Sequence, residues 1–409
     1  MRIVIIGAGP AGLMTAVECS KNKDNQVIIL ESNEKIGKKL FITGKGRCNV
    51  TNNCSNDEFL KNVVTNSKFL YNSISNFSTN DTINFFNESG TLLKVERGNR
   101  VFPKSDKSSD IIKTFSKLLK KDNVKLYLNT LVSDIVKKEE TFKVKTTQGN
   151  IKGDAVVVAT GGKSYSSTGS KGDGYKFAKR FNHTIIKPVP ALIPINLKNY
   201  DGSLSGLSLK NVLISINING KRFSEFGEML FTHNGISGPI VLTLSSYINK
   251  FEIKDKDILL DLKPALSYEQ LNDRIIRDCS ENKNKTLKNY LKELLPLSLI
   301  DFFIKAGNFK PDCKMCNLEK NVRKNIIQCL KNLTFKVDKF EDIEYAIVTS
   351  GGVNVKEINP KNMESKYVKN LFFVGEVLDL DALTGGFNIQ IALSTGFSSG
   401  NYLKNICKN

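Results

Sequence analysis

Residues 2–31 decide the fold, and they read Arg2-Ile-Val-Ile-Ile-Gly7-Ala-Gly9-Pro-Ala-Gly12, then a helical stretch to about Ser20, then Gln26-Val-Ile-Ile-Leu-Glu31. A β-forming run is followed by Gly-x-Gly-x-x-Gly, a helix, a second apolar strand and an acid. This order predicts the first half of a Rossmann-like α/β domain with a parallel sheet. The acid lies 19 residues after the third glycine, a spacing typical of dinucleotide-binding sites.

The three glycines have separate physical roles in such a loop. Gly7 permits the tight turn, Gly9 lets the backbone approach a pyrophosphate, and Gly12 lets the helix pack on the strand. The helix N-terminus would face the phosphates, and Glu31 would accept hydrogen bonds from an adenosine ribose. The motif therefore predicts nucleotide binding, without separating NAD from FAD.

Two later strands favour FAD. Residues 154–162 predict an apolar strand that ends at Gly161 and Gly162, and residues 371–376 predict another that ends at Gly375 and Glu376. A strand followed by glycine and an acid near the carboxyl end resembles the segment with which many FAD enzymes hold the ribityl chain. The sequence has no second Gly-x-Gly-x-x-Gly, so a separate nicotinamide-binding domain is not expected.

The segment after Glu376 predicts a helix directed at the flavin. Gly385 and Gly386 form a turn, and an apolar, small-residue helix begins at Phe387. Its N-terminus would direct N–H groups and a positive dipole toward the pyrimidine edge of a flavin. Because reduced flavin carries negative charge there, this arrangement would raise its reduction potential.

Composition excludes several protein classes. The chain has 409 residues, of which 40% are hydrophobic, enough for a large core and inconsistent with disorder as the main state. Its net charge is +19, which suits a nucleic-acid partner, but 51 of the 60 basic residues are Lys and they are spread along the chain. We interpret the charge as a solvated Lys-rich surface, which argues against nucleic acid as a partner.

The cysteines and the start of the chain favour a cytoplasmic protein. No signal peptide precedes the first strand, and no apolar run is long enough for a membrane span. Reduced thiols are therefore expected. The pair Cys313 and Cys316 has only Cys329 nearby, so we predict no metal site, and structural thiols or a redox pair remain open. The other cysteines are Cys19, Cys48, Cys54, Cys279 and Cys407.

Several longer segments carry a resemblance to a known family. They include Gly37-Lys-Lys-Leu-Phe-Ile-Thr-Gly-Lys-Gly-Arg47-Cys48-Asn49-Val-Thr-Asn52, Gly98-Asn-Arg-Val-Phe-Pro103, Phe231-Thr-His-Asn-Gly-Ile-Ser-Gly-Pro239 and Thr349-Ser-Gly-Gly-Val353. Residues 159–175 and 359–365 complete the set. Over nearly its whole length the chain resembles the bacterial HI0933-like family of FAD-binding oxidoreductases, also called the aminoacetone-oxidase or bile-acid-reductase flavoprotein family.

The resemblance implies an α/β fold with a Rossmann-like FAD-binding domain of the glutathione-reductase type, built from residues 1–190 and 345–409. It also implies a β-barrel-like insert (191–264 and 334–344) that carries a small helical bundle (265–333). The residues agree, because Val212–Ile218, Asn219-Gly220 and the next strand read as a hairpin. From about Tyr268 to Leu333 the apolar spacing becomes helical.

The motifs and the resemblance together predict the cofactor-binding residues. Arg47 suits paired phosphate oxygens, Cys48 and Asn49 are expected near the flavin or its phosphates, and Val132 is expected to pair its backbone with adenine. The full set is Gly7, Gly9, Ala11, Gly12, Glu31, Lys39, Arg47, Cys48, Asn49, Val132, Thr160, Gly161, Gly375, Glu376, Gly386, Asn388 and Ile389.

The resemblance implies a flavoprotein oxidoreductase that passes hydride from transiently bound NADH or NADPH through FAD to a small organic acceptor. The family's activities indicate the C=C bond of an enone, such as a 3-oxo bile acid or steroid. His233, in a Gly-rich loop, and Tyr165 are the candidate proton donors. Two alternatives stay open: an FAD-dependent oxidase of a small, aminoacetone-like amine using O₂, and an RNA-associated flavoprotein. The sequence does not predict the oligomeric state.

Overall fold

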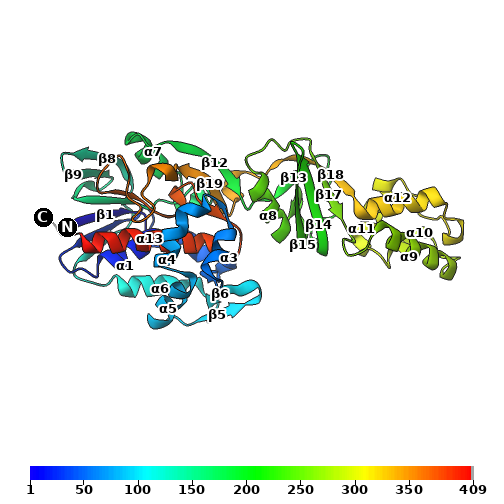
Figure 1. Ribbon diagram of the computed structural model, residues 1–409, viewed down its shortest axis with the longest axis horizontal. Coiled ribbons are helices and arrows are strands. Elements are labelled where there is room, and N and C mark those ends of the chain that lie inside the picture. Colours follow the sequence, from blue (N-terminus) through cyan, green and yellow to red (C-terminus); the bar gives the residue numbers. More distant parts are fainter. Residues whose placement is uncertain (407–409) are drawn as a thin grey trace. The chain divides into compact units, whose positions relative to one another are not determined.

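The computed structural model describes residues 1–406, and residues 407–409, including Cys407, lie outside the described part of the chain. The chain divides into two compact units (Figure 1). Unit 1 comprises Met1–Ala191 and the chain from Asp342 onward, and unit 2 comprises Leu192–Glu341. Segments from both ends of the chain therefore build unit 1.

A five-stranded parallel sheet forms the centre of unit 1. Its strand order is β20 (Leu371–Phe373), β11 (Ala155–Val158), β1 (Arg2–Ile6), β2 (Gln26–Leu30) and β7 (Val124–Tyr127). The strands β11 and β20 are buried throughout, and β1 and β2 are buried at all but their first residues. Continuous apolar strands of this kind suit a parallel sheet covered on both faces. The predicted Rossmann-like α/β fold is confirmed.

Helix α13 (Phe387–Asn405), near the end of the chain, packs directly against helix α1 (Pro10–Cys19) near its start (Figure 1). A Cβ atom on Gly396 would lie 2.4 Å from the carbonyl oxygen of Ala11, so only glycine allows this approach. Thr15 strengthens the contact, since its Oγ1 donates a hydrogen bond of 3.1 Å to the carbonyl oxygen of Gly396. The first glycine loop is thereby fixed against the last helix.

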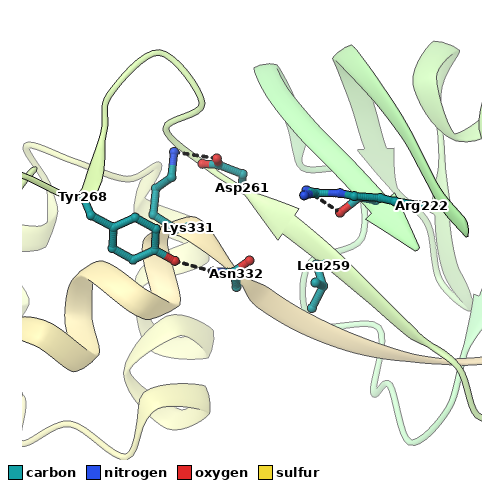
Figure 2. A pocket seen from close by; sticks show the side chains of 7 residues that line it. Arg222, Leu259, Asp261, Tyr268, Lys331 and Asn332 are labelled. Carbon is teal, nitrogen blue, oxygen red and sulfur yellow. Dashed lines mark hydrogen bonds and ion pairs between the residues drawn. The ribbon is translucent and has the colours of Figure 1, made fainter. Parts of the chain in front are cut away.

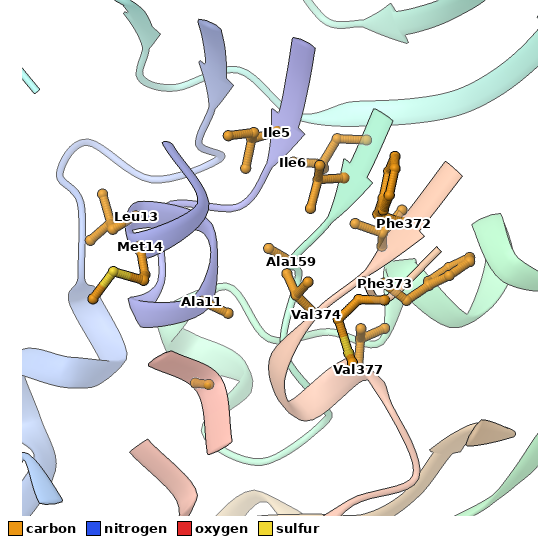
Figure 3. Close-up of a cluster of buried hydrophobic side chains, with 14 of the residues drawn as sticks. Ile5, Ile6, Ala11, Leu13, Met14, Ala159, Phe372, Phe373, Val374 and Val377 are labelled. Carbon is orange, nitrogen blue, oxygen red and sulfur yellow. The ribbon is translucent and has the colours of Figure 1, made fainter. Parts of the chain in front are cut away.

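The hydrophobic core of unit 1 joins elements from distant parts of the sequence. Figure 3 shows buried side chains of β1, α1, the end of β11 and the segment 372–377 gathered in one cluster. The residues drawn include Ile5, Ile6, Ala11, Leu13, Met14, Ala159, Phe372, Phe373, Val374 and Val377. Their burial fixes the position of the two loops that follow β1 and β20.

Smaller elements surround this core. The helices are α2 (Lys38–Ile42), α3 (Asn56–Lys61), α4 (Tyr71–Asn76), α5 (Thr79–Glu88), α6 (Ser108–Leu118) and α7 (Asp173–Arg180). Two three-stranded sheets are formed by β3 (Thr51–Asn52), β6 (Arg100–Pro103) and β5 (Leu93–Glu96), and by β10 (Gly149–Gly153), β9 (Thr141–Thr146) and β8 (Val132–Lys138). Two strand pairs are β12 (Ile185–Ala191) with β19 (Val348–Val353), and β21 (Asp381–Ala382) with β4 (Val63–Thr65).

Unit 2 contains a closed barrel. Its strands, in order around the barrel, are β13 (Ile195–Leu197), β16 (Gly235–Ser237), β15 (Lys221–Phe231), β14 (Ser208–Ile218), β17 (Asp257–Asp261) and β18 (Leu333–Phe340). The predicted hairpin is present as β14 and β15, joined by Asn219 and Gly220 with φ of +52° and +78°. Positive φ at both turn residues matches the twist of the flanking strands.

Helix α8 (Pro239–Ile248) packs on the barrel, and four further helices lie in the segment for which a helical bundle was predicted. They are α9 (Tyr268–Glu281), α10 (Leu287–Leu291), α11 (Leu297–Gly307) and α12 (Lys320–Lys331). One hydrophobic cluster includes both barrel and helix side chains, so these helices share a core with the barrel. Within residues 1–406, no helix combines the length and apolar character that crossing a membrane requires.

Candidate functional site

The carboxyl ends of the parallel strands bring many predicted residues to one edge of the sheet. Gly7 follows β1, Glu31 follows β2, Thr160 lies two residues beyond β11, and Gly375 lies two residues beyond β20. Strands β2 and β7 lie on one side of β1, and the later strands β11 and β20 lie on its other side. The strand order therefore changes direction at β1. Ligands of doubly wound sheets bind outside the carboxyl ends at such a point.

The three glycines of the first loop differ in how closely other backbone atoms approach them. A Cβ atom on Gly7 would lie 2.5 Å from the carbonyl oxygen of Ala159, and one on Gly12 would lie 2.0 Å from that of Gly7. These two glycines are therefore required by the packing of the chain itself. At Gly9, a Cβ atom would meet no protein atom within 4 Å. The middle glycine borders open space, as a position approached by a ligand would.

Glu31 is a buried acid with a defined orientation. Its side chain accepts hydrogen bonds from the N–H of Ala8 at 2.8 Å and from the side-chain amide of Asn33 at 2.7 Å. The N–H of Thr130 donates to the carbonyl oxygen of Glu31 at 2.8 Å, and Val132 begins β8 two residues later. The structure therefore brings Val132 near Glu31, from a segment remote in sequence.

A second charged cluster joins four segments of unit 1. Lys39, in α2, donates through Nζ to Oε2 of Glu376 at 2.8 Å and to Oγ of Ser164 at 2.7 Å. The other oxygen of Glu376, Oε1, accepts the N–H of Thr349 at 2.9 Å and the hydroxyl of Ser164 at 3.1 Å. Lys39 and Glu376 are each about one-fifth exposed, so the pair is partly shielded from solvent.

Tyr165 belongs to this cluster, whereas Thr160 and Gly161 shape the backbone before it. The Nζ atom of Lys39 lies 5.9 Å from the ring centre of Tyr165. Gly161 has a φ of +73°, and a Cβ atom there would lie 2.8 Å from Oγ of Ser170. The buried Oγ1 of Thr160 has no hydrogen-bond partner among the described residues.

The start of α13 is built as expected, but Asn388 is engaged locally. Gly386 precedes the helix with a φ of +100°, and a Cβ atom there would lie 2.4 Å from the carbonyl oxygen of Thr51. The side chain of Asn388 bonds both backbone polar groups of Ala382, at 2.9 and 2.7 Å. Asn388 therefore holds the loop before the helix in shape. Ile389 packs partly buried against the core.

The segment around Arg47 differs from a simple phosphate site. The guanidinium group of Arg47 forms ion pairs with Glu96 and Asp106 and stacks on the ring of Phe102 at 4.1 Å. A phosphate at this position would compete with two carboxylates. Asn49 ties the segment to β6, since its Oδ1 accepts the N–H of Val101 at 3.2 Å.

Cys48 is enclosed in the same segment. It is fully buried with a φ of +60°, and burial raises the pKa of its thiol to about 12 although a hydrogen bond with Thr43 opposes the shift. At neutral pH this side chain is a neutral thiol, which is a poor nucleophile.

His233 lies in unit 2, whereas the other predicted site residues lie in unit 1. It is exposed in the loop between β15 and β16. Cys313 and Cys316 are also in unit 2, as free thiols that are half-buried and exposed, respectively. Among residues 1–406 no group of three or more His, Cys, Asp or Glu side chains could hold a metal ion.

Four residues of this region were not singled out by the sequence. Ser164 and Thr349 lie in segments that carry the family resemblance, so their position was a usable signal. Tyr175 lies in the same segment as Ser164; its buried hydroxyl has no partner among the described residues, and burial followed by the charge of Glu376 raises its pKa. Thr395, whose Oγ1 accepts the N–H of Gly375 at 3.0 Å, acts through helix packing that no local pattern reveals.

These residues fit the diphosphate and ribose of a dinucleotide such as FAD. Helix α1 has Pro10 in its first turn and no side-chain cap at Gly9, so its first N–H groups are not capped by a side chain. Those groups and the positive end of the helix dipole suit a diphosphate, and the open space at Gly9 admits it. The carboxylate of Glu31, at the end of β2, suits ribose hydroxyls.

Comparison with known proteins agrees with this fold. The chain is 29% identical to a 3-dehydro-bile acid delta(4,6)-reductase of Clostridium scindens, over 98% of each chain. It is 30% identical to a ribosomal RNA dihydrouridine synthase of Haemophilus influenzae, over 97% of this chain and 96% of the relative. Among solved structures, 3-ketosteroid delta1-dehydrogenase from Sterolibacterium denitrificans aligns with a TM-score of 0.52 at 12% identity, over 98% of this chain and 99% of that one.

The family comparison covers nearly the whole molecule. The family described as "HI0933-like protein Rossmann domain" matches residues 1–402. The match includes the glycine loop, the Lys39–Glu376 cluster and all of unit 2. The chain belongs to the HI0933-like family and has its Rossmann-type FAD-binding fold.

Proposed function

We propose that the protein is an FAD-dependent reductase of a carbon–carbon double bond conjugated to a carbonyl group. One observation carries the proposal: the carboxyl edge of the parallel sheet gathers the open Gly9 position, the buried Glu31 and the Lys39–Glu376 cluster. These groups suit, in order, the diphosphate, the adenosine ribose and the ribityl chain of FAD. When bound, FAD would supply hydride transfer, with NADH or NADPH as the transient electron donor.

The residues divide the work of holding the cofactor. The N-terminus of α1 would bind the diphosphate, Glu31 would accept hydrogen bonds from the ribose hydroxyls, and the backbone at Val132 would pair with adenine. The N-terminus of α13, at Gly386, would direct its dipole toward the flavin ring and would favour negative charge there. Thr160, Gly161, Gly375 and Ile389 would contact the cofactor between its diphosphate and its flavin ring.

Two relatives with different substrates support the proposed substrate class. A bile-acid delta(4,6)-reductase and a dihydrouridine synthase share one type of reaction. In both, hydrogen adds across a C=C bond conjugated to a carbonyl, so hydride goes to the β-carbon and a proton to the α-carbon. A single flavin site can serve both, with the pocket around it deciding which substrate enters.

We expect a side chain near the acceptor to supply the proton. Tyr165 is one candidate donor, because it adjoins the Lys39–Glu376 cluster and its hydroxyl is a suitable acid for an enolate. His233 is the other, since it is exposed in a loop and carries an imidazole that can donate a proton. The variants Tyr165→Phe and His233→Asn distinguish the two candidates. Loss of the true donor should slow the reoxidation of flavin by the acceptor and leave the reduction of flavin by NADH or NADPH unchanged.

A uridine of ribosomal RNA is the second candidate substrate. The charge pattern alone argued against nucleic acid, but a relative named for dihydrouridine synthesis in ribosomal RNA revises that interpretation. The net charge of +19 would favour association with a polyanion. A cytoplasmic location is part of the same proposal.

The test is an anaerobic one. Purified protein containing FAD is reduced with NADH or NADPH, then mixed with a 3-oxo-Δ4 steroid, a uridine-rich RNA fragment, or buffer. Rapid flavin reoxidation by one of the first two, with a saturated product, supports the proposal and names the substrate. Rapid reduction by aminoacetone followed by O₂-dependent peroxide release, with no reoxidation by either C=C substrate, would instead establish the oxidase alternative.

A further inference from the structure

Unit 2 contains a cavity of its own, at the outer face of its barrel. The cavity has a volume of about 320 Å³ and is lined by strands β14, β15 and β17 together with the start of α9 and the end of α12. This volume is at the lower end of the range for small-molecule sites, about 300–1,000 Å³. All of its lining residues belong to unit 2.

Strand register places the charged residues of the cavity on one face of the barrel wall. Ser215 pairs with Leu259, and Leu213 pairs with Asp261, so Leu259 and Asp261 share the face of Ser215. Arg222 pairs with Asn217, two residues from Ser215, and so lies on that same face. The intervening residues Ile214, Ile216, Ile258 and Leu260 are buried in the barrel core.

The charges on this face do not balance. Lys331 pairs with Asp261 at 2.6 Å and also donates to two backbone carbonyl oxygens. Asp261 accepts the N–H of Lys263 as well, at 2.9 Å. Arg222 donates only to the neutral Oγ of Ser215, at 3.2 Å, and forms no ion pair with any described residue. The guanidinium group of Arg222 therefore lines the cavity without a carboxylate partner, because Asp261 pairs with Lys331.

The opposite side of the cavity offers an aromatic ring and an amide. Figure 2 shows Tyr268, Lys331 and Asn332 across from Arg222, with Asp261 and Leu259 of β17 between the two sides. Asn332 donates to the hydroxyl of Tyr268 at 2.6 Å, and this hydroxyl donates to Gln328 at 3.0 Å, so the ring is held in place. Nearly half of the Tyr268 side chain is exposed, which leaves surface for stacking.

We propose that this cavity binds a nucleotide, with its phosphate at Arg222 and its base against Tyr268 and Asn332. A guanidinium group matches phosphate oxygens in a bidentate way, an aromatic ring stacks on any base, and an amide pairs with base edges. The lining suits a steroid less well, because Leu259 is its one aliphatic side chain. The source is either a free nucleotide or one unit of an RNA strand, which present the same chemistry.

Binding measurements on the full-length protein containing FAD test the site without relying on turnover, so the result is independent of the proposed reductase function. The probes are UMP, single-stranded octauridylate and inorganic phosphate, measured by titration calorimetry. The variants are Arg222→Gln and, as the matched control, Lys221→Gln. Lys221 is the neighbouring residue, its Nζ lies over the ring of Phe223, and its substitution removes the same charge.

We expect UMP or octauridylate to bind, phosphate to compete, and Arg222→Gln to weaken binding about tenfold or more with Lys221→Gln unchanged. Tyr268→Leu should weaken UMP binding but leave phosphate binding intact. Binding of UMP alone would identify a free nucleotide as the ligand, and binding of octauridylate alone would identify a strand. Equal losses in Arg222→Gln and Lys221→Gln would overturn the proposal, as would no binding of either nucleotide probe by the folded protein.

Discussion

Lys39 and Glu376 form an ion pair of 2.8 Å although 337 residues separate them in the sequence. Lys39 lies in α2, after the first glycine loop, and Glu376 follows β20 near the end of the chain. Both side chains also form hydrogen bonds with Ser164, which follows β11. The pair therefore connects α2 with the segments that follow β11 and β20. These contacts hold the carboxylate of Glu376 in one orientation.

Removing the ammonium group of this pair should weaken FAD binding. In Lys39→Met, the partly buried carboxylate of Glu376 loses its cation and keeps only the hydrogen bonds from Thr349 and Ser164, so it should be held less firmly where we propose that it meets the ribityl chain. We expect FAD affinity to fall about tenfold and the free energy of unfolding by about 1–2 kcal/mol. Fluorescence titration of apoprotein with FAD measures the first effect and urea unfolding the second.

Lys113→Met provides the control for that experiment. Lys113 is 77% exposed and pairs with Asp110 within one helix, so its removal changes net charge without changing the cluster. If Lys39→Met and Lys113→Met bind FAD equally well, the pair does not orient a cofactor-binding carboxylate.

The glycine loop gives a prediction that separates folding from cofactor binding. In Gly9→Ala the new Cβ atom meets no protein atom, so stability without FAD should stay near the wild-type value. The same atom would occupy the space that a diphosphate approaches, so FAD affinity should fall at least about tenfold. Equilibrium dialysis with FAD and thermal unfolding of the apoprotein measure the two quantities.

Gly12→Ala should behave in the opposite way. Its Cβ atom would lie 2.0 Å from the carbonyl oxygen of Gly7, so the loop must move or the protein lose about 3 kcal/mol. The apoprotein melting temperature should therefore drop in Gly12→Ala and not in Gly9→Ala. A stable Gly12→Ala protein with normal FAD affinity would contradict this account of the loop.

Local patterns predicted part of the fold, and the family resemblance implied the rest, including the barrel-like insert and its helices. The glycine spacing and four apolar strands predict the parallel sheet, and Asn219-Gly220 between alternating residues predicts the hairpin. Each of these features is encoded within about ten residues, through turn geometry or strand burial. The packing of α13 on α1 could not be predicted in this way. A glycine is required at position 396 only because Ala11, on another helix, approaches it closely.

The site was harder to predict because each polar side chain can bond to several partners, and the fold decides which of them lies within reach. Arg47 suits a phosphate, but the fold places Glu96 and Asp106 beside it, and two carboxylates capture the guanidinium group. Asn388 follows a glycine turn as expected, yet its amide closes that turn on Ala382. Both outcomes depend on segments brought together by folding, which spacing along the chain does not contain.

Cys48 should be chemically inert in the folded protein. Its thiol is buried and its pKa is raised to about 12, so almost no thiolate is present at pH 8. Among the described cysteines Cys316 is the exposed one, and it should react with iodoacetamide before Cys48, as peptide mass spectrometry would show. Alkylation of Cys48 at the rate of Cys316 in native protein would contradict this and favour a redox role for Cys48.

His183 should make stability depend on pH. The ring is buried, with Nδ1 at 3.1 Å from Glu357 and Nε2 at 2.8 Å from Oγ of Ser365. Burial lowers its pKa in the folded protein below the ordinary value of 6.5, although Glu357 opposes the shift. Below pH 6.5 the unfolded chain therefore takes up a proton that the folded protein resists.

The stabilising effect of a neutral His183 is thus complete above pH 6.5 and is lost as the pH falls from there toward the lowered pKa. The slope from this one group is at most about 1.4 kcal/mol per pH unit. Urea unfolding at pH 7.5, 6.5 and 5.5 should show a smaller fall in His183→Gln than in the wild type. His233→Gln is the control, because His233 is the other histidine of the chain and is exposed, so its pH dependence should match the wild type. An unchanged slope in His183→Gln would show that carboxylates alone control the acid side of the stability curve.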